Sequence, residues 1–481
     1  MIRLTAREIA GLLGGTLFGD PEAVVIGDAQ TDSRLVGPGD VFFAMPGATT
    51  DGARFAPSAV EAGAVLVVAE RRVDVDAPIV VVPSALDALS ALAREVVARV
   101  RALGRLRVVA VTGSNGKTTT KNMLRAILSS AGETVAPEGS FNNEVGAPIT
   151  MLRVTEDTAF LVIEMGADAV GDVAKLVALA VPDVGIVLKV GTAHIGKFGS
   201  QEAIAVAKGE MVRDLPASAV AVLNADDPNV AAMPTAAQVR PFGLVDRAAA
   251  AAPDPAAWLA ADVRISLGGT AFTLLHGGER QEVRLRILGE HHVMNALAAL
   301  AAADAVGVAP AEAVPALEGM VRAERWRMEL LGGGPELPGD VTVINDAYNA
   351  SPESTAAALR TLAELTRGRA RAIAVIGEMA ELGEFATEAH DRIGRLAVRL
   401  NVDHLVVVGE RARAMHLGAQ HEGSWGSEVE FVETADAAYD AVRALLRAGD
   451  VVLVKSSKSA GLRHLGDRLA GIELPESEAN A

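Results

Sequence analysis

The first part of the chain contains short apolar runs separated by turn residues. Three early runs lie at residues 41–44, 65–68 and 79–82. Such runs, bounded by Gly, Pro and charged residues, are typical of short strands. Between Ser84 and Gly104 the spacing changes, because leucine and valine residues recur at helical intervals along one face. The pattern therefore predicts a small α/β module followed by a connecting helix.

Farther along, apolar runs alternate with alanine-rich helical stretches. These runs lie at residues 108–111, 160–163, 184–188 and 220–223. Alternation of this kind indicates a mostly parallel sheet covered by helices on both faces. A cluster of Pro and Gly at residues 332–339 resembles a break between domains. A second alternation follows it, with runs at residues 372–376, 405–408 and 451–454.

The chain is long enough to form several hydrophobic cores. One core rarely serves 481 residues, and the alternating pattern occurs in separate blocks. We expect an α/β fold with three domains, at residues 1–83, 84–321 and 322–481.

Composition narrows the class of protein. The net charge of −17 and the aromatic content of 3% disfavour a basic, stacking groove for nucleic acid. The absence of cysteine excludes disulfides, thiolate metal sites and a cysteine nucleophile. No export signal is visible at the amino terminus, and no uninterrupted apolar stretch is long enough to span a bilayer. We expect a cytoplasmic protein that does not insert into a membrane.

A phosphate-binding loop is the sharpest chemical signal. The run at 108–111 leads directly into Gly113-Ser114-Asn115-Gly116-Lys117-Thr118-Thr119. Glycines allow backbone N–H groups to face phosphate oxygens, the lysine adds a positive charge, and the helix amino terminus adds its dipole. Thr118, directly after the lysine, is the expected Mg²⁺ ligand. The bland alternative is a glycine-rich strand-to-helix turn without a ligand.

Three further side chains are candidates for the same site. Glu164 ends the run at 160–163, so it should lie at the sheet edge where α/β folds bind ligands. Next to a phosphate loop it could hold a metal, although a glutamate at a strand end is usually a solvated boundary residue. His194 follows another strand and, taken alone, is more often structural. Lys208 lies in a helical stretch, where a lysine ordinarily reaches solvent.

Taken together, these residues resemble the Mur ligase family, the ATP-dependent amino-acid-adding enzymes of peptidoglycan synthesis. The resemblance spans nearly the whole chain, and the short glycine spacing of the loop is a feature of that family. Other matching phrases lie at residues 141–148, 193–200, 207–210, 345–352 and 377–383. The segment 141–148 is similar to the NNxxGxP segment of the member that adds D-alanyl-D-alanine to UDP-N-acetylmuramoyl-tripeptide.

The resemblance implies an architecture of a small UDP-sugar-binding module, a central P-loop ATPase-like sheet and a Rossmann-like carboxyl-terminal domain. It also implies a role for each matching residue. Catalytic roles fall to Lys117, Lys208, His194, Glu164 and Arg327, with Arg325 as an alternative to Arg327. Nucleotide contacts fall to the loop residues 113–119, Asn295, Arg327 and Asp346. Substrate contacts fall to Ser33, Arg34, Asn142 and Asn143. Metal ligands are Thr118, Glu164, His194 and Lys208, the last as a carbamate. Lys455 and Ser459 fit a KGSxS-type motif of the family, but Ser456 and Ser457 replace its Gly-Ser pair here, so their role is left open.

The implied reaction is ATP-dependent. The family phosphorylates a carboxylate to an acyl phosphate, which an amine then attacks. For this chain the implied partners are UDP-N-acetylmuramoyl-tripeptide, D-alanyl-D-alanine, ATP and two Mg²⁺ ions, with a monomer as the expected state. Three alternatives remain. The Mur ligase that adds the third residue is disfavoured by the lack of a DNPR motif, and a folylpolyglutamate synthase is disfavoured by the amino-terminal module and by Asn142-Asn143. A non-catalytic nucleotide switch would not need two metal sites.

Overall fold

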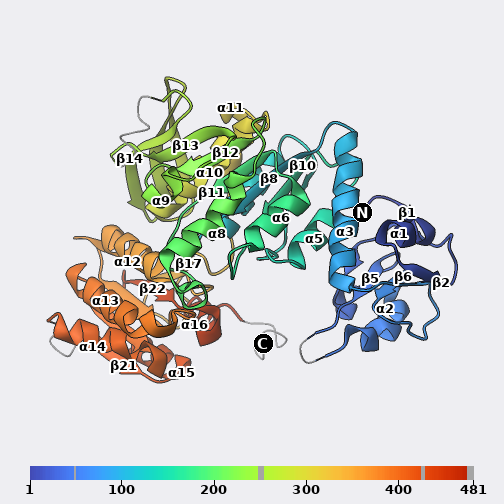
Figure 1. Cartoon of the computed structure of the whole chain (residues 1–481). Coiled ribbons are helices and arrows are strands. Elements are labelled where there is room, and N and C mark those ends of the chain that lie inside the picture. Colours follow the sequence, from blue (N-terminus) through green and yellow to red (C-terminus); the bar gives the residue numbers. More distant parts are fainter. Residues whose placement is uncertain (48–49, 247–253, 424–427, 474–481) are drawn as a thin grey trace.

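The computed structural model describes residues 1–47, 50–246, 254–423 and 428–473. Three α/β parts follow one another along the chain, each around its own sheet (Figure 1). In this view the amino-terminal part, in blue, lies at the right, and the carboxyl-terminal part, in orange and red, lies at the lower left. The predicted α/β class is confirmed. Among the described residues, no helix is long and apolar enough to cross a membrane.

The amino-terminal part is built on a five-stranded sheet. Its strands, in spatial order, are β2 (Thr16–Phe18), β7 (Ile79–Val81), β6 (Leu66–Ala69), β5 (Val41–Ala44) and β4 (Ala29–Gln30). The three early runs are thus confirmed as the central strands, and β5 and β6 are buried throughout because both of their faces are covered. Around the sheet lie α1 (Ala6–Leu13), α2 (Ala56–Ala62) and the small pair β1 (Leu4–Thr5) and β3 (Val24–Val25).

The predicted connecting helix is α3 (Ala85–Ala102). Ser84 caps it by accepting a hydrogen bond from the N–H of Asp87, and it ends just before Gly104, whose φ is +87°. Its leucine and valine face is buried. That face packs against both α1 and α5, so the helix joins the first part of the chain to the second.

The central part contains a nine-stranded sheet. Its strands, in spatial order, are β16 (Glu279–Leu285), β15 (Gly269–His276), β14 (Trp258–Ser266), β13 (Gln238–Leu244), β12 (Val220–Asn224), β11 (Val184–Val187), β8 (Arg107–Thr112), β10 (Phe160–Glu164) and β9 (Thr134–Val135). The strands from β9 to β14 pair in parallel, whereas β15 pairs antiparallel with both β14 and β16. The prediction of a mostly parallel sheet is confirmed.

Helices cover both faces of this sheet. The central helices are α4 (Lys117–Leu128), α5 (Gly146–Leu152), α6 (Asp172–Ala180), α7 (Ile195–Phe198), α8 (Gln201–Arg213), α9 (Pro228–Ala231), α10 (Glu290–Ala305) and α11 (Pro310–Glu318). Alternate residues of β8 enter different cores: Val109 packs in the core that contains α4 and α10, and Val108 in the core that contains α5 and α6. The carboxyl end of β8 is therefore held firmly from both sides.

The carboxyl-terminal part has a six-stranded sheet. Its strands, in spatial order, are β17 (Glu329–Gly332), β18 (Thr342–Asn345), β22 (Val451–Lys455), β19 (Ala372–Ile376), β20 (His404–Val408) and β21 (Val429–Val432). Its helices are α12 (Pro352–Thr366), α13 (Ala386–Arg399), α14 (Arg413–His421), α15 (Ala435–Leu445) and α16 (Leu462–Leu469). The three predicted strands in this part are confirmed.

The interpretation of residues 332–339 as a break is wrong. This segment connects β17 to β18, which pair antiparallel at the edge of the carboxyl-terminal sheet. Pro and Gly mark a turn equally well inside a domain as between domains, and only the pairing of the flanking strands distinguishes the two cases. The predicted domain boundaries themselves stay predictions, and residues 48–49, 247–253, 424–427 and 474–481 of these ranges lie outside the described residues.

Candidate active site

The glycine loop lies between the end of β8 and the start of α4. Gly116 has a φ of +87°, and a Cβ there would overlap Oδ1 of Asn295. A Cβ on Gly113 would lie 2.9 Å from Cβ of Leu188. Lys117 donates a hydrogen bond from Nζ to the carbonyl of Gly113 at 2.8 Å, so its side chain folds back over the loop. Both glycines are thus required by the close approach of neighbouring elements.

Neighbouring strands fix the rest of the loop. The Ser114 N–H donates to the carbonyl of Lys189 at 2.8 Å, and the Ser114 hydroxyl accepts from the N–H of Gly191 at 2.9 Å. Thr118 and Thr119 are buried in the first turn of α4. The loop is therefore held in shape by the segment that follows β11 as well as by its own glycines.

Glu164 lies beside this loop because β10 pairs in parallel with β8. Only 1% of the residue is exposed, and Oε1 accepts a hydrogen bond from Nδ2 of Asn142 at 2.8 Å. Oε2 is buried without a hydrogen-bond partner in the described part of the chain. A buried carboxylate oxygen without a donor is costly, and a divalent cation would satisfy it.

Two lysines on α4 supply positive charge. Burial lowers the pKa of Lys117 and of Lys121, and the carboxylate of Glu164 opposes the shift in both. Lys121 donates to the carbonyls of Pro137 at 2.9 Å and Gly139 at 3.0 Å. The sequence reasoning missed Lys121, although its place one helical turn after Lys117 could have indicated it.

Lys208, on α8, is buried, with only 3% of the residue exposed. Its ordinary tendency to reach solvent is thus overridden by the packing of α8 against the sheet. Burial, and next the positive charge of Lys117, lower the pKa of Lys208 to about 7, while Asp168, Glu210 and Asp172 oppose the shift. A substantial part of the population therefore carries a neutral amine at neutral pH.

His194 lies at the entrance of α7 with a φ of +63°. Its Nδ1 contacts the carboxylate of Glu381, which comes from the carboxyl-terminal part, and lies 3.9 Å from Oδ1 of Asp168. Burial lowers the pKa of His194, while the nearby Glu381 raises it. A carboxylate at one ring nitrogen leaves the other nitrogen available as a metal ligand, an arrangement typical of metal-binding histidines.

The carboxyl-terminal part is docked against the loop. Nη2 of Arg327 donates to Oγ1 of Thr118 at 3.2 Å, and the hydroxyl of Ser351 donates to Oδ1 of Asn115 at 3.3 Å. Oε1 of Glu353 accepts from both the N–H and the hydroxyl of Thr192, at 2.8 and 2.7 Å. Arg325, the alternative to Arg327, instead donates to Asp467 within the carboxyl-terminal part.

Several of these contacts were not expected individually. Tyr348 places its hydroxyl 3.3 Å from that of Ser140, which itself lies 3.4 Å from Oγ1 of Thr118. The guanidinium of Arg327 lies over the Tyr348 ring, 4.3 Å from its centroid. Tyr348 and Ser351 both belong to the segment 345–352, which matches the family in sequence. Only the docked structure shows what Tyr348 contacts.

Asn295 and Asp346, the other predicted nucleotide contacts, differ in their surroundings. Asn295 is buried near the start of α10, against Gly116, with Nδ2 3.4 Å from Nδ1 of His292. Asp346 has both carboxylate oxygens engaged inside the carboxyl-terminal part, one with the N–H of Met328 and one with Lys455.

The predicted substrate residues are divided between two places. Asn142 contacts Glu164, whereas Oδ1 of Asn143 accepts from the N–H groups of Val145 and Gly146 at the start of α5. Ser33 and Arg34 lie in a short 3₁₀ turn of the amino-terminal part, where Arg34 pairs with Asp32 at 2.6 Å. No contact in the described ranges joins these two residues to the loop.

No group of three or more His, Asp or Glu side chains that could hold a metal occurs within the described residues. The predicted ligand set contains only two side chains of these types, Glu164 and His194, together with a threonine and a modified lysine. Such a set depends on the modification of Lys208 for its third charged ligand, so this observation does not test it.

Comparisons with known proteins place these features in a family. Three family models match: "Mur ligase family, catalytic domain" at residues 28–110, "Mur ligase middle domain" at 111–303 and "Mur ligase, glutamate ligase domain" at 326–458. The UDP-N-acetylmuramoyl-tripeptide–D-alanyl-D-alanine ligase of Mycobacterium tuberculosis is 44% identical, with 98% of each chain covered.

Solved structures agree over the same extent. A crystal structure of MurF from Acinetobacter baumannii has a TM-score of 0.85 at 28% identity, covering 98% of this chain and 99% of that one. The MurF ligase of Thermotoga maritima, in complex with ADP, has a TM-score of 0.78 at 26% identity, covering 95% and 99%. Sequence and structure agree along almost the entire length, and this chain therefore belongs to the Mur ligase family.

Proposed function

We propose that this chain is an ATP-dependent ligase that joins D-alanyl-D-alanine to UDP-N-acetylmuramoyl-tripeptide and so forms a peptidoglycan precursor. The proposal is carried by three features of one site: the phosphate loop, the Glu164 oxygen that has no partner among the described residues, and Arg327 of the docked carboxyl-terminal part. This arrangement suits phosphoryl transfer to a carboxylate. The choice of substrates rests on the full-length relatives, which are UDP-N-acetylmuramoyl-tripeptide–D-alanyl-D-alanine ligases.

ATP would lie along the glycine loop, near Asn295 and Arg327. The backbone of residues 113–116 and Lys117 suit its phosphates, and the solved relative in complex with ADP supports a nucleotide at this fold. Thr118, Glu164 and His194 are the residues that would hold Mg²⁺, which neutralises phosphate charge when it is bound. Asp346, whose oxygens are engaged internally, is a weaker candidate for direct nucleotide contact.

Lys208 would act as a carbamate. Carbon dioxide adds to a neutral amine, forming a C–N bond and releasing a proton, and the lowered pKa of Lys208 supplies that amine at neutral pH. The product is an anion that could serve a second Mg²⁺ beside His194. Two ions and the carbamate are parts of this proposal that follow from the family resemblance and from the burial of Lys208.

The chemistry proceeds in two displacements. An oxygen of the tripeptide carboxylate attacks the terminal phosphorus of ATP, forming an acyl phosphate and releasing ADP. The amine of D-alanyl-D-alanine then attacks the acyl carbon, the C–O bond to phosphate breaks, and the amine loses a proton as the C–N bond is completed. Lys117 and Arg327 offset the negative charge that spreads over the moving phosphoryl group.

The remaining substrate residues follow from the resemblance. Ser33 and Arg34 would contact the UDP-sugar, and Asn142 and Asn143 would lie beside the peptide. A docked carboxyl-terminal part would keep water from the acyl phosphate. The monomeric state and the cytoplasmic location stay predictions.

Release of ADP and the mass of the product test the proposal. We expect ADP release to require both UDP-N-acetylmuramoyl-tripeptide and D-alanyl-D-alanine, with a product of the corresponding pentapeptide mass. Turnover with UDP-N-acetylmuramoyl-dipeptide and a single amino acid would instead identify the ligase that adds the third residue. ATP turnover indifferent to both substrates would refute the ligase assignment and favour a nucleotide switch.

A further inference from the structure

Arg327 is presented to the loop by a strained turn. The residues on both sides of it have positive φ, +58° at Trp326 and +49° at Met328. Non-glycine residues rarely adopt this conformation, and they keep it only when surrounding contacts hold them there. The contacts that hold this turn therefore determine where the guanidinium of Arg327 lies.

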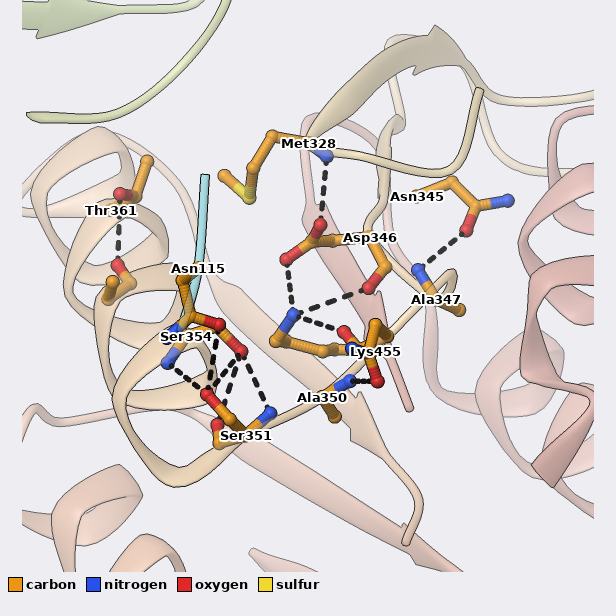
Figure 2. A network of polar contacts seen from close by, with 12 residues as sticks. Asn115, Met328, Asn345, Asp346, Ala347, Ala350, Ser351, Ser354, Thr361 and Lys455 are labelled. Atoms are coloured by element: carbon orange, nitrogen blue, oxygen red, sulfur yellow. Dashed lines mark hydrogen bonds and ion pairs between the residues drawn. The ribbon is translucent and has the colours of Figure 1, made fainter. Parts of the chain in front are cut away.

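One side of the turn is fixed by Asp346. Its Oδ1 accepts a hydrogen bond from the N–H of Met328 at 3.0 Å, directly after Arg327. Its Oδ2 accepts from Nζ of Lys455 at 2.7 Å. Figure 2 shows the carboxylate of Asp346 between the Met328 nitrogen and the Lys455 ammonium. The Asp346 carboxylate thus joins the buried lysine to the strained backbone.

Lys455 is placed for this role by the sheet. It is the last residue of β22, and Asp346 directly follows β18, which pairs in parallel with β22. Lys455 is 1% exposed, and its Nζ also donates to the carbonyl of Asn349 at 2.9 Å. A buried ammonium needs a paired anion, so the lysine holds Asp346 in one orientation.

The other side of the turn has hydrogen bonds of its own. The N–H of Trp326 donates to Oε2 of Glu329 at 2.9 Å, and its indole N–H donates to Oδ2 of Asp467 at 2.8 Å. With Trp326 held in this way, Met328 is the end of the turn whose position depends on Asp346 and Lys455. The turn spans the junction between the central and carboxyl-terminal parts, so a small change here moves Arg327 relative to Thr118.

We infer that Lys455 is a positioning residue that acts through Asp346 and the Met328 N–H to hold Arg327 against the phosphate loop. This inference rests on the proposed function, because it assigns Lys455 to the phosphoryl-transfer step. It also gives Asp346 a role other than nucleotide contact. The segment that begins at Lys455 differs from the family motif, which has a glycine after the lysine. The role inferred for Lys455 does not require that glycine.

Amide hydrogen exchange tests the structural link without any substrate. In Lys455→Met, we expect peptides that contain Met328 to exchange faster, while peptides of β8 stay protected as in the parent chain. Lys458→Met, three residues along at an exposed position, is the matched control and should leave both regions unchanged. Unaltered exchange at Met328 in Lys455→Met would overturn the inference, whether or not the parent chain is active.

A double-mutant cycle tests the link to catalysis. We expect Lys455→Met to lower kcat by about ten- to a hundredfold with little change in the KM for ATP, and Arg327→Ala to lower it further. If Lys455 acts through Arg327, the double variant should be no more than about twofold slower than Arg327→Ala. Multiplied effects, or an equal kcat in Lys455→Met and the parent, would refute the role.

A second variant serves if Lys455→Met cannot be studied. If Lys455→Met does not fold, because Asp346 becomes a buried unpaired carboxylate, the pair Asp346→Asn with Lys455→Met removes both charges. The same exchange and cycle measurements then apply, with the same expected outcomes. Failure of the proposed function would appear separately, as a parent chain that releases no ADP with the two substrates although the exchange result holds.

Discussion

Single side chains of this site acquire their chemistry from burial. Lys208 is the clearest case, because the packing of α8 places an ordinary-looking helical lysine where its pKa falls to about 7. Glu164 is another, with one carboxylate oxygen left without a donor inside the described ranges. Neither property is visible in the residue type or its neighbours in sequence.

The lowered pKa of Lys208 predicts a pH-dependent modification. The neutral amine, which reacts with carbon dioxide, becomes more abundant as pH rises through the lowered pKa of about 7. We therefore expect the ¹³C signal of a lysine carbamate, formed with ¹³C-labelled bicarbonate, to rise as pH increases through 7. Lys208→Arg should abolish the signal. A signal of equal size in that variant would show that another amine is modified.

Glycines lie at the end of the connecting helix and in the phosphate loop, and the two positions differ in why they need glycine. Gly116 and Gly104 both have a φ of +87°, but only Gly116 has a neighbour in the space that a Cβ would occupy. They thus form a matched pair, in which one glycine is required by backbone conformation alone and the other by conformation and close approach.

Replacement of these two glycines should separate the two requirements. We expect Gly104→Ala to lose about 1 kcal/mol of unfolding free energy and to bind ATP normally, because only the left-handed backbone is strained. Gly116→Ala should weaken ATP binding more than tenfold, since its Cβ displaces Asn295 or the loop. Calorimetric titration with ATP and thermal unfolding measure the two effects. Equal ATP affinities in the two variants would contradict the expected role of the loop.

The central and carboxyl-terminal parts approach each other closely at a glycine of α7. A Cβ on Gly196, in α7, would lie 2.8 Å from both the carbonyl of Glu381 and the N–H nitrogen of Gly383. These backbone atoms belong to the carboxyl-terminal part and cannot move aside as a flexible side chain could. The contact between α7 and the turn at residues 381–383 therefore tolerates no side chain at position 196.

Gly196→Ala should hinder docking without damaging the loop. We expect kcat to fall at least tenfold while ATP affinity falls less than in Gly116→Ala, because the Arg327 contact is weakened but the loop residues of the central part are untouched. Small-angle X-ray scattering should show a larger radius of gyration for the variant. Gly11→Ala, in α1 with nothing near its Cβ, is the control. An unchanged kcat in Gly196→Ala would show that this contact is not needed for turnover.

Local patterns were sufficient for much of the fold and for the loop. The strands and connecting helix follow from apolar periodicity, and the phosphate loop follows from a few consecutive residues, because both are decided by interactions close along the chain. The misread segment at 332–339 shows the limit of this method, since the pairing of β17 with β18 is a contact between strands and not a local preference.

The long-range contacts belong to the folded chain alone. Arg327 and Thr118 are 209 residues apart in sequence, and the choice of Arg327 over Arg325 at the loop follows from how the carboxyl-terminal part docks. The burial of Lys208, the pairing of Asp346 with Lys455 and the strain around Arg327 likewise arise from contacts between residues distant in sequence, within a part or between parts. The amino-acid order thus specifies which groups are available for chemistry. Their charge state, orientation and partners arise from desolvation and close packing by residues distant in sequence, which exist only once the three parts have folded and met.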